Sequence, residues 1–494
     1  MTARTRLVAA AMLLAAGGAL YAQSGNVRVR VRPITVNPTV NVNVNPRASW
    51  YMHEDGRPGP DAAQVTALLA GLGRSDAAVC GMAVDVLGNS WGGWSRHEVS
   101  AFRDEAADPA VRRAFEGQVK DSAAIEVAAG ALGDANACVR RAAARLLGQS
   151  SNPVATARLR AAFGGSDARA REAAIYGLGT AEDLESFDAL VRALRDSDVG
   201  IARMSAWALG EIEDPRAVAP LADRLRGSDR GVRLASVWAL GQIEDAAAVA
   251  PLLPVLRDPD VSLRIAAAEA LGDIEDGGAV EGLAAALDDR ELLVRRAAAQ
   301  ALGDIEDARA VPALVRALGS DDELLRVDAA QALGEIEDAG AVEGLIRTLR
   351  DRSVRVRTAS AQALGEIESP RAGEALAAAL GDAELEVRRA AVHALGQLDE
   401  LTTAPAGLTA ALKDRDPEMR QAAAHALGEI GDVNAVAALA DAYRGEQQVE
   451  VRRAVVAALG EIEGARATET LVLAMKDADA EVRRAAAHAL GERD

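Results

Sequence analysis

The chain has 494 residues and a formal net charge of −19, and 50% of its residues are hydrophobic although only 3% are aromatic. The acidic balance argues against a nucleic-acid partner, because contacts to phosphates dominate nucleic-acid binding. The scarcity of aromatic residues argues against one large globular core and is typical of small side chains that let short helices pack closely.

Residues 1–22 predict a secretory signal peptide. Arg4 and Arg6 precede an apolar run that ends at Ala22, which gives a positive segment, a hydrophobic segment and a small residue at the cleavage point. The run is too short for a comfortable membrane span, which needs about 20 apolar residues. We therefore expect cleavage near Ala22, an exported protein that is periplasmic or secreted, and no stable membrane insertion.

Residues 23–60 predict an extended arm and linker rich in valine, arginine and asparagine. Valine alternates with arginine at 27–32 and with asparagine at 40–45, and a period of two indicates strand. Pro33, Pro38 and Pro46 interrupt the pattern and favour edge or non-strand conformations. Two interpretations stay open: an extended tether, and a basic β-arm that pairs with a partner's sheet edge or lies along the acidic repeats.

Residues 61–122 predict degenerate repeats that cap the N-terminal end of a repeat array. Helical periodicity gives a first helix pair at 61–72 and 76–87, whereas 89–120 is irregular and contains a WGGW motif at 91–94. Such atypical units are expected at an end, because an exposed terminal core needs a cover.

The two cysteines, Cys80 and Cys138, are expected to be buried free thiols. They fall in repeats separated by one whole unit, and neighbouring helices pack about 8–10 Å apart. That separation exceeds the limit of roughly 7 Å between Cα atoms for a disulfide. A disulfide is the alternative, because an exported protein meets an oxidising compartment.

Residues 123–494 predict a regular repeat array. A Leu-Gly pair recurs every 31 residues, with two spacings of 32, and a fixed period of roughly 20–50 residues is the signature of stacked repeats. The expected fold class is all-α, an α-solenoid of about 14 two-helix repeats of 31–32 residues. The glycines of these pairs are Gly148, Gly179, Gly210, Gly241, Gly272, Gly303, Gly334, Gly365, Gly396, Gly428, Gly460 and Gly491.

Each regular repeat predicts two helices with their own N-caps. Val311, Leu314 and Leu318 form the apolar stripe of a first helix, and Val294 and Ile305 belong to the inward face of a second one. A short polar side chain before each helix accepts unpaired backbone N–H groups. The first-helix caps are Asp214, Asp307, Asp338 and Ser369, and the second-helix caps are Asp198, Asp229, Asp260, Ser353, Asp416 and Asp479. The repeated glycine gives up about 1 kcal/mol of helix propensity, which indicates a close approach of two backbones.

One arginine recurs eight residues before the glycine and four residues after the second-helix cap. An acid followed by a base at this spacing is favourable on a helix. We expect a structural ladder of Arg–carboxylate pairs that ties repeat to repeat, rather than a ligand site. The arginines are Arg140, Arg171, Arg233, Arg264, Arg295, Arg326, Arg357, Arg388, Arg420, Arg452 and Arg483.

The segments VRRAAAQALGDIED at 294–307 and AVPALVRAL at 310–318 resemble the HEAT-like repeats first described in phycobilisome lyases. The resemblance covers about 123–494 and implies the solenoid fold, but repeats of this type occur in lyases, hydroxylases and pure scaffolds. One relative of this type, deoxyhypusine hydroxylase, is an iron enzyme that uses paired His-Glu motifs. Here His97–Glu98 lies in the irregular segment, and the corresponding repeat positions are Arg296 and Ala297. We therefore expect no catalytic residues, no metal and no cofactor.

Three positions share one polar face of the second helix: seven and three residues before the glycine and one after it. We expect this stripe to line the concave surface. The aromatics at the central position suggest an anchor for a partner, although Trp can also pack over the small Ala residues of its neighbour. The histidines stand on separate repeats, so a compact zinc site is not expected. The expected contact residues at the central position are Tyr176, Trp207, Trp238, Gln300, Gln331, Gln362, His393, His425 and His488, with Glu269 between them.

Carboxylates gather at the end of each second helix, where the helix dipole disfavours them. The acids directly after the glycine suggest an acidic ridge for a basic partner or for loosely held calcium, and a solvated face is the simpler interpretation. Later acids of each set, such as Glu306 and Asp307, are interpreted as first-turn acids of the following helix. The ridge residues are Glu211, Glu335, Glu366, Glu429 and Glu461.

The sequence as a whole favours an exported, non-catalytic scaffold that binds a protein or peptide on its concave face. The aromatic residues would anchor the partner and the acidic residues would steer a basic one. The alternative is an enzyme or chaperone of the lyase or hydroxylase repeat type that acts on a tetrapyrrole or on a protein side chain.

Overall fold

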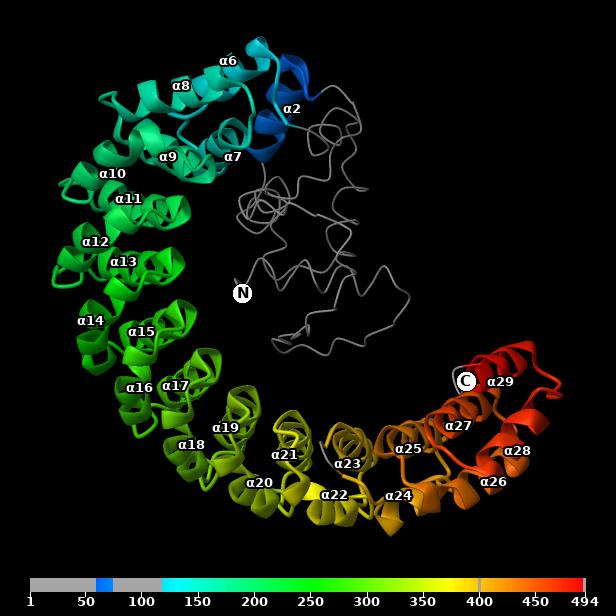
Figure 1. The fold of residues 1–494 in the computed structure, drawn as a ribbon. Helices are drawn as coiled ribbons and strands as arrows, with labels where there is room; N and C mark the ends of the chain where they lie inside the picture. The colour runs from blue at the N-terminus through cyan, green and yellow to red at the C-terminus, as the bar shows by residue number, and fades with distance from the viewer. Residues whose placement is uncertain (1–58, 74–117, 399–400, 492–494) are drawn as a thin grey trace. The chain divides into compact units, whose positions relative to one another are not determined.

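The computed structural model describes residues 59–73, 118–398 and 401–491, and every regular element in these ranges is a helix. The expected signal peptide, nearly all of the extended arm, the second predicted helix at 76–87 and the WGGW motif lie outside these ranges. The chain divides into two compact units, residues 1–158 and 159–494, which are described separately (Figure 1).

The N-terminal unit contains α2 (Ala62–Leu72), α6 (Ser122–Gly130) and α7 (Ala137–Gly148). The boundary between the two units falls within α8 (Pro153–Phe163). α2 begins at Asp61, whose side chain accepts from Gln64 N while the Gln64 side chain accepts from Asp61 N. This capping box satisfies two backbone donors and fixes the start of the first predicted helix. α2 packs directly against both α6 and α7.

Cys138 is disulfide-bonded, so the expectation of free thiols is wrong. The only other cysteine of the sequence, Cys80, lies outside the described residues. The expectation assumed that one whole repeat separates the two positions. Instead, α2 packs on α7, and Asn136 Nδ2 donates to Gly73 O over 3.1 Å. The chain therefore leaves α2 beside the first turn of α7, which carries Cys138.

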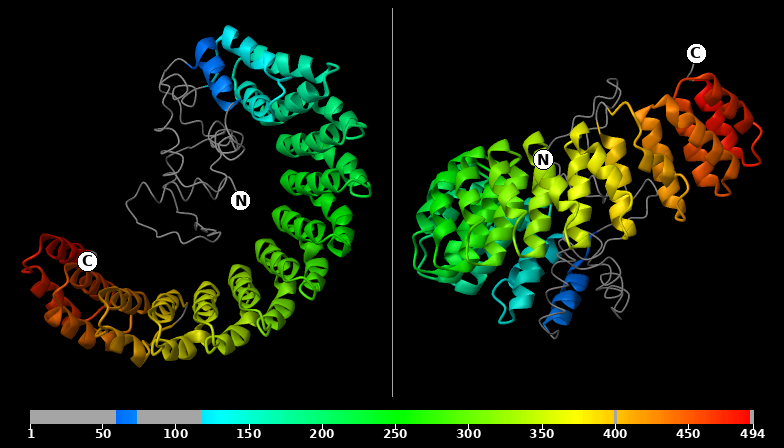
Figure 2. Two further views of the ribbon diagram at one scale, coloured as in Figure 1. Left: turned by 180° about the vertical axis from the view of Figure 1, so that it is seen from behind. Right: turned by 90° about the horizontal axis from the view of Figure 1, so that it is seen from below.

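The C-terminal unit is a single curved row of helix pairs (Figures 1 and 2). Its first helices form the outer row: α10 (Phe187–Ala193), α12 (Val218–Arg224), α14 (Val249–Leu252), α16 (Val280–Ala286), α18 (Val311–Ala317), α20 (Val342–Thr348), α22 (Gly373–Ala379), α24 (Ala406–Ala411), α26 (Val436–Gly445) and α28 (Ala465–Ala474). Its second helices form the inner row: α9 (Ala168–Thr180), α11 (Val199–Ile212), α13 (Arg230–Ile243), α15 (Val261–Ile274), α17 (Leu292–Ile305), α19 (Glu323–Ile336), α21 (Val354–Glu366), α23 (Leu385–Gln397), α25 (Pro417–Ile430), α27 (Val449–Glu461) and α29 (Ala480–Gly491). The expected α-solenoid is therefore confirmed.

Most first helices begin with one turn of 3-10 helix before the α-helix. The 3-10 turns are η1 (Leu184–Ser186), η2 (Pro215–Ala217), η3 (Ala246–Ala248), η5 (Gly277–Ala279), η6 (Ala308–Ala310), η7 (Ala339–Ala341), η8 (Pro370–Ala372) and η9 (Val433–Ala435), and η4 (Leu253–Arg257) instead follows α14. Asp307 caps such a turn by accepting from Arg309 N. Ser369 occupies the same position but makes no side-chain capping bond, so the cap expected there is absent.

The core of this unit is built from aliphatic residues, with alanine prominent between successive second helices. Val294, Ala298 and Leu302 are fully buried on α17, which packs on α15 and α19. A Cβ added to Gly303 would lie 2.9 Å from the Cα atom of Ala332 on the next helix. Real Cβ atoms do not approach a backbone so closely, so this position requires glycine. The predicted close approach of backbones is confirmed, and the same contact at Gly241, Gly272, Gly334, Gly365 and Gly428 explains the loss of helix propensity in those repeats.

A glutamate in the left-handed region closes second helices from α9 to α21. Glu306 has φ 57°, and its N–H donates to Gly303 O over 3.1 Å. It therefore ends α17 and is not in the first turn of the following helix, so that interpretation was wrong for this acid. Asp307 caps η6 rather than belonging to its first turn. The left-handed residues are Glu182, Glu213, Glu244, Glu275, Glu306, Glu337 and Glu368.

Candidate functional site

The three aromatic residues of the predicted stripe form one stack across α9, α11 and α13. The Tyr176 and Trp207 rings are 4.9 Å apart between centroids and 26° from parallel, and the Trp207 and Trp238 rings are 6.4 Å apart and 13° from parallel. Tyr176 is only 7% exposed, so it is not the exposed contact residue that the sequence suggested. Its ring is covered by Trp207, whereas Trp207 and Trp238 stay partly exposed.

Each tryptophan also packs over the glycine of the preceding repeat. A Cβ at Gly179 would lie 2.8 Å from Trp207 Cζ3, and one at Gly210 would lie 2.8 Å from Trp238 Cζ3. Packing on the neighbouring repeat was the alternative interpretation of these residues, and here it coexists with partial exposure. Trp238 ends the stack, because the next residue in the row is Glu269.

Two apolar residues extend the exposed part of this stack. Leu234 and Ile265 lie seven residues before their glycines and are partly exposed at the edge of the core, as are Trp207 and Trp238. The sequence interpretation described this position as polar from other repeats and therefore missed them. The sequence did contain a signal for them, because Leu234 and Ile265 are apolar where several other repeats have a polar residue.

Carboxylates border this apolar patch on α15. The Glu269 side chain is exposed at the surface, yet desolvation raises its pKa above the ordinary value, and repulsion from Asp273 adds to the shift. The pKa of Glu244 is also raised, first by desolvation and then by Glu213, Glu275 and Asp273. Negative charge thus accumulates along successive repeats, which favours a positively charged group nearby.

The remaining members of the central row are exposed on the second helices. Gln300, Gln331, Gln362, His393, His425 and His488 are all exposed. His425 Nδ1 lies 3.4 Å from Glu429 Oε1 on the same helix. In the described residues, no group of three or more His, Cys, Asp or Glu side chains could hold a metal ion. These residues lie on separate second helices and offer separate polar contacts.

The predicted acidic ridge is unevenly exposed. Glu366, Glu429 and Glu461 are exposed, whereas Glu211 and Glu335 are half-buried. The Glu335 carboxylate lies against Gly303, where an added Cβ would collide with it. Binding of a basic partner by this ridge stays a prediction.

The recurring arginine joins successive repeats through their loops. Arg264 Nη1 donates to Asp258 O over 2.8 Å in its own repeat, and its Nε lies 2.8 Å from Asp289 Oδ2 in the next. The partner is thus the loop carboxylate of the following repeat and not the cap four residues earlier. The pairs are Arg171–Asp196, Arg233–Asp258, Arg264–Asp289, Arg326–Asp351, Arg357–Asp382, Arg388–Asp414, Arg420–Glu446 and Arg452–Asp477.

These ion pairs lower the pKa values of aspartates that they contain. Burial acts to raise the pKa of Asp351, but hydrogen bonds from Arg326 and Ser353 N hold it below the ordinary value. The hydrogen bond from Arg357 is the largest cause of the lowered pKa of Asp382. The ladder is therefore a set of ionised, mostly half-buried pairs that join neighbouring repeats.

A family model for HEAT repeats matches residues 99–179, 162–241, 218–292, 249–333, 280–365, 317–396, 373–449 and 442–494. The chain belongs to the HEAT-repeat family. The regular helix pairs and their close glycine contacts are the structural counterpart of this match. No curated protein matches the sequence of this HEAT-repeat protein.

Comparison with solved structures finds similar chains, including the following three. A chain from the structure in which Kap95p binds RanGDP has a TM-score of 0.50 and 14% identity, with 87% of this chain and 66% of that chain covered. This protein therefore spans just under two thirds of that neighbour. An engineered protein has a TM-score of 0.41 and 23% identity, covering 74% of this chain and 98% of that one. The CpcE–CpcF complex of phycocyanin lyase from Nostoc sp. has a TM-score of 0.29 and 28% identity, covering 46% and 92%.

Within the described residues, no helix is long and apolar enough to cross a membrane.

Proposed function

We propose that this HEAT-repeat protein is an exported, non-catalytic scaffold that binds a protein or peptide along the inner row of second helices. The observation that carries the proposal is a partly exposed apolar patch of Trp207, Leu234, Trp238 and Ile265 that borders the acidic residue Glu269. Partly exposed tryptophans at the centre of a polar surface are typical of binding hot spots.

The patch favours a partner segment in which an apolar side chain stands beside a basic one. The apolar side chain would cover Trp238 and Ile265. A lysine or arginine would then meet Glu269 and Asp273. Desolvation raises the pKa of Glu269, and repulsion from Asp273 raises it further. A positive charge placed there relieves that repulsion, so the gain is larger than for an isolated surface acid.

A displayed peptide library, selected for binding to the native full-length protein, tests this proposal. Peptides with an apolar residue next to Lys or Arg should be enriched, and Trp238→Ala should weaken the selected peptide by about tenfold or more, as truncation of a hot-spot aromatic does. Val472→Ala, which removes an exposed apolar side chain from the outer-row helix α28, is the control. Equal binding by the Trp238→Ala protein would refute the anchor.

Export is proposed on the N-terminal sequence alone. Fractionation of the native cells should place the protein outside the cytoplasm, and N-terminal sequencing should find a mature chain that starts near Gln23. The alternative function, an enzyme or chaperone acting on a tetrapyrrole or a protein side chain, would gain support from a stoichiometric transition metal in the purified protein.

A further inference from the structure

Two cavities open on the edge of the C-terminal unit formed by the loops that join first to second helices. One, of about 680 Å³, lies between the repeats of α16–α17 and α18–α19 and is lined by Arg295 and Arg316. The other, of about 580 Å³, lies between the repeats of α18–α19 and α20–α21 and is lined by Arg347, Arg350 and Arg352. The loop at 319–321 borders both cavities, so they form one continuous edge.

The arginine ladder is interrupted at the first cavity. Arg295 donates to Asp289 O over 2.7 Å, as its counterparts do in their own loops. The position 25 residues later, which holds Asp289 for Arg264 and Asp351 for Arg326, is occupied by Ser320. No carboxylate of the described residues lies within ion-pair distance of Arg295. In neighbouring repeats the equivalent arginine binds a carboxylate, so a carboxylate is the group expected to fit Arg295.

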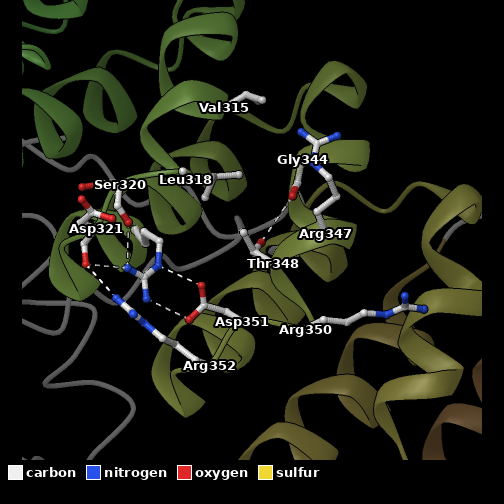
Figure 3. Close-up of a pocket in the computed structure, with 12 residues that line it drawn as sticks. Val315, Leu318, Ser320, Asp321, Gly344, Arg347, Thr348, Arg350, Asp351 and Arg352 are labelled. Atoms are coloured by element: carbon white, nitrogen blue, oxygen red, sulfur yellow. Dashed lines mark hydrogen bonds and ion pairs between the residues drawn. The ribbon is translucent and has the colours of Figure 1, made fainter.

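The second cavity adds three exposed arginines that also lack a carboxylate partner among the described residues. Arg347 lies on α20 beside Gly344, and Arg352 extends to Asp321 and donates to its backbone oxygen over 3.2 Å. The Arg350 side chain extends away from the side chains of Arg347 and Arg352 (Figure 3). The neighbouring Asp351 is already held by Arg326 through hydrogen bonds of 2.9 Å. Arg347, Arg350 and Arg352 thus add positive charge to an edge that Asp321 and Asp351 also line, in a chain of net charge −19.

We propose that this edge binds an acidic peptide segment of a partner protein. One carboxylate would take the place at Arg295 that an aspartate takes in neighbouring repeats, and further carboxylates would meet Arg347, Arg350 and Arg352. Arginine pairs with carboxylates in a planar two-pronged geometry, which makes such contacts stronger than neutral hydrogen bonds.

The arrangement fits several acidic groups better than one small anion. The guanidinium groups of Arg350 and Arg352 extend in opposite directions (Figure 3), so no single phosphate or carboxylate reaches both. Asp288, Asp289, Asp321, Asp322 and Asp351 also border the cavities, which disfavours a compact, multiply charged ion between them. An extended peptide can place its acids beside the arginines and its backbone beside the aspartates. The overall negative charge opposes binding only weakly, because salt screens exposed charges beyond about 10 Å at 0.1 M.

Fluorescence anisotropy with the native full-length chain and a labelled octaglutamate peptide tests the proposal, with octaglutamine and inorganic phosphate as comparison probes. The Arg347→Gln/Arg350→Gln/Arg352→Gln variant should lower octaglutamate affinity by about tenfold or more, through loss of charge-assisted contacts. The variant Arg226→Gln/Arg257→Gln/Arg415→Gln removes the same charge from exposed loop-edge arginines of other repeats and should change affinity by less than about threefold. Ser320→Asp should also weaken the peptide, because it supplies Arg295 with an internal carboxylate, whereas the neutral Ser320→Asn should not.

Four outcomes would overturn the proposal: no octaglutamate binding at low salt, equal binding of octaglutamine, equal losses in the two triple variants, or no effect of Ser320→Asp. Displacement of the peptide by phosphate, beyond the effect of chloride at the same ionic strength, would instead assign a single-anion site and would also refute it. The Trp238→Ala variant should bind octaglutamate as the native chain does, so this test is independent of the inner-row proposal.

Discussion

Arg326 and Asp351 stand 25 residues apart in the sequence and meet through two parallel hydrogen bonds of 2.9 Å, from Nε and Nη2 to the two carboxylate oxygens. Arg326 is only 4% exposed, and its Nη1 also donates to Ser320 O and Asp321 O in its own repeat. One side chain thus fixes its own loop and the loop of the next repeat. The contact recurs at most interfaces of the unit, with the exception of Arg295, and joins those repeats in a similar way.

Removal of one partner of this pair should destabilise the C-terminal unit strongly. Asp351→Ala leaves the buried Arg326 guanidinium without its counter-charge, and such losses amount to about 3–5 kcal/mol. Denaturant unfolding monitored by helicity measures the change. Asp223→Ala is the control, because its pair with Arg195 is exposed and 3.4 Å long, so its loss should be below about 1 kcal/mol. Comparable losses of unfolding free energy in both variants would contradict the prediction that the buried pair stabilises the unit more than the exposed one.

A methyl group on the repeated glycine should be harmful although it raises helix propensity. At Gly272 an added Cβ would lie 2.9 Å from Ala301 Cα, so Gly272→Ala must push two helices apart. We expect a loss of about 1–3 kcal/mol, larger than the gain of about 1 kcal/mol from replacing glycine in a helix. Gly445→Ala, which has no neighbour within 4 Å, should be neutral or stabilising. The melting temperatures of both variants decide the matter.

The aromatic stack predicts unequal effects of its two tryptophans on stability. Trp207 is flanked by Tyr176 and Trp238, whereas Trp238 stacks on one side only. Trp207→Ala should therefore destabilise by about 1 kcal/mol more than Trp238→Ala, the value of one additional aromatic pair. Denaturant titration of each variant gives the two free energies of unfolding. An equal loss, or a larger loss for Trp238→Ala, would show that the stack contributes little.

Acid should weaken the ladder in a defined pH range. The pKa values of Asp196, Asp289, Asp351, Asp382 and Asp477 are lowered in the folded chain. A lowered pKa means that the unfolded state binds protons first, so the contribution of these groups is complete above about pH 4 and declines as the pH falls towards their folded pKa values. Unfolding free energies measured from pH 7 to pH 2 should decline below that point, and Asp351→Asn should make the decline shallower. A stability that is constant down to pH 2 would contradict the ion-pair account.

The left-handed glutamates should be better replaced by glycine than by alanine. Glu306 has φ 57°, a conformation that disfavours a side chain with a Cβ by about 1–2 kcal/mol. Glu306→Gly should therefore be more stable than Glu306→Ala by about 1 kcal/mol. Both variants lose the same carboxylate, so the comparison isolates the backbone. Thermal unfolding of the pair is the measurement, and equal melting temperatures would contradict it.

Repeat length and pattern were sufficient to predict the solenoid, because they depend on local rules. The apolar spacing around Leu302 and Ile305 fixes which face of a helix is buried, and the glycine at 303 reveals a close contact before its partner is known. The same local rules mis-assigned Glu306, since a helix end in the left-handed region was not distinguishable from the first turn of the next helix. They also predicted a free thiol at Cys138, which is disulfide-bonded on a helix that packs against α2.

The sequence by itself therefore determined the class of fold, the repeat boundaries and the positions that face the core, because these follow from the periodicity of each helix. Only the tertiary structure decided which side chains of neighbouring repeats meet: that Tyr176 lies beneath Trp207, that Arg326 binds Asp351 rather than its own cap, and that Arg295 faces a serine where its counterparts meet a carboxylate. Such contacts depend on the rise and rotation between repeats, which are set by packing across the interface and not by any single helix.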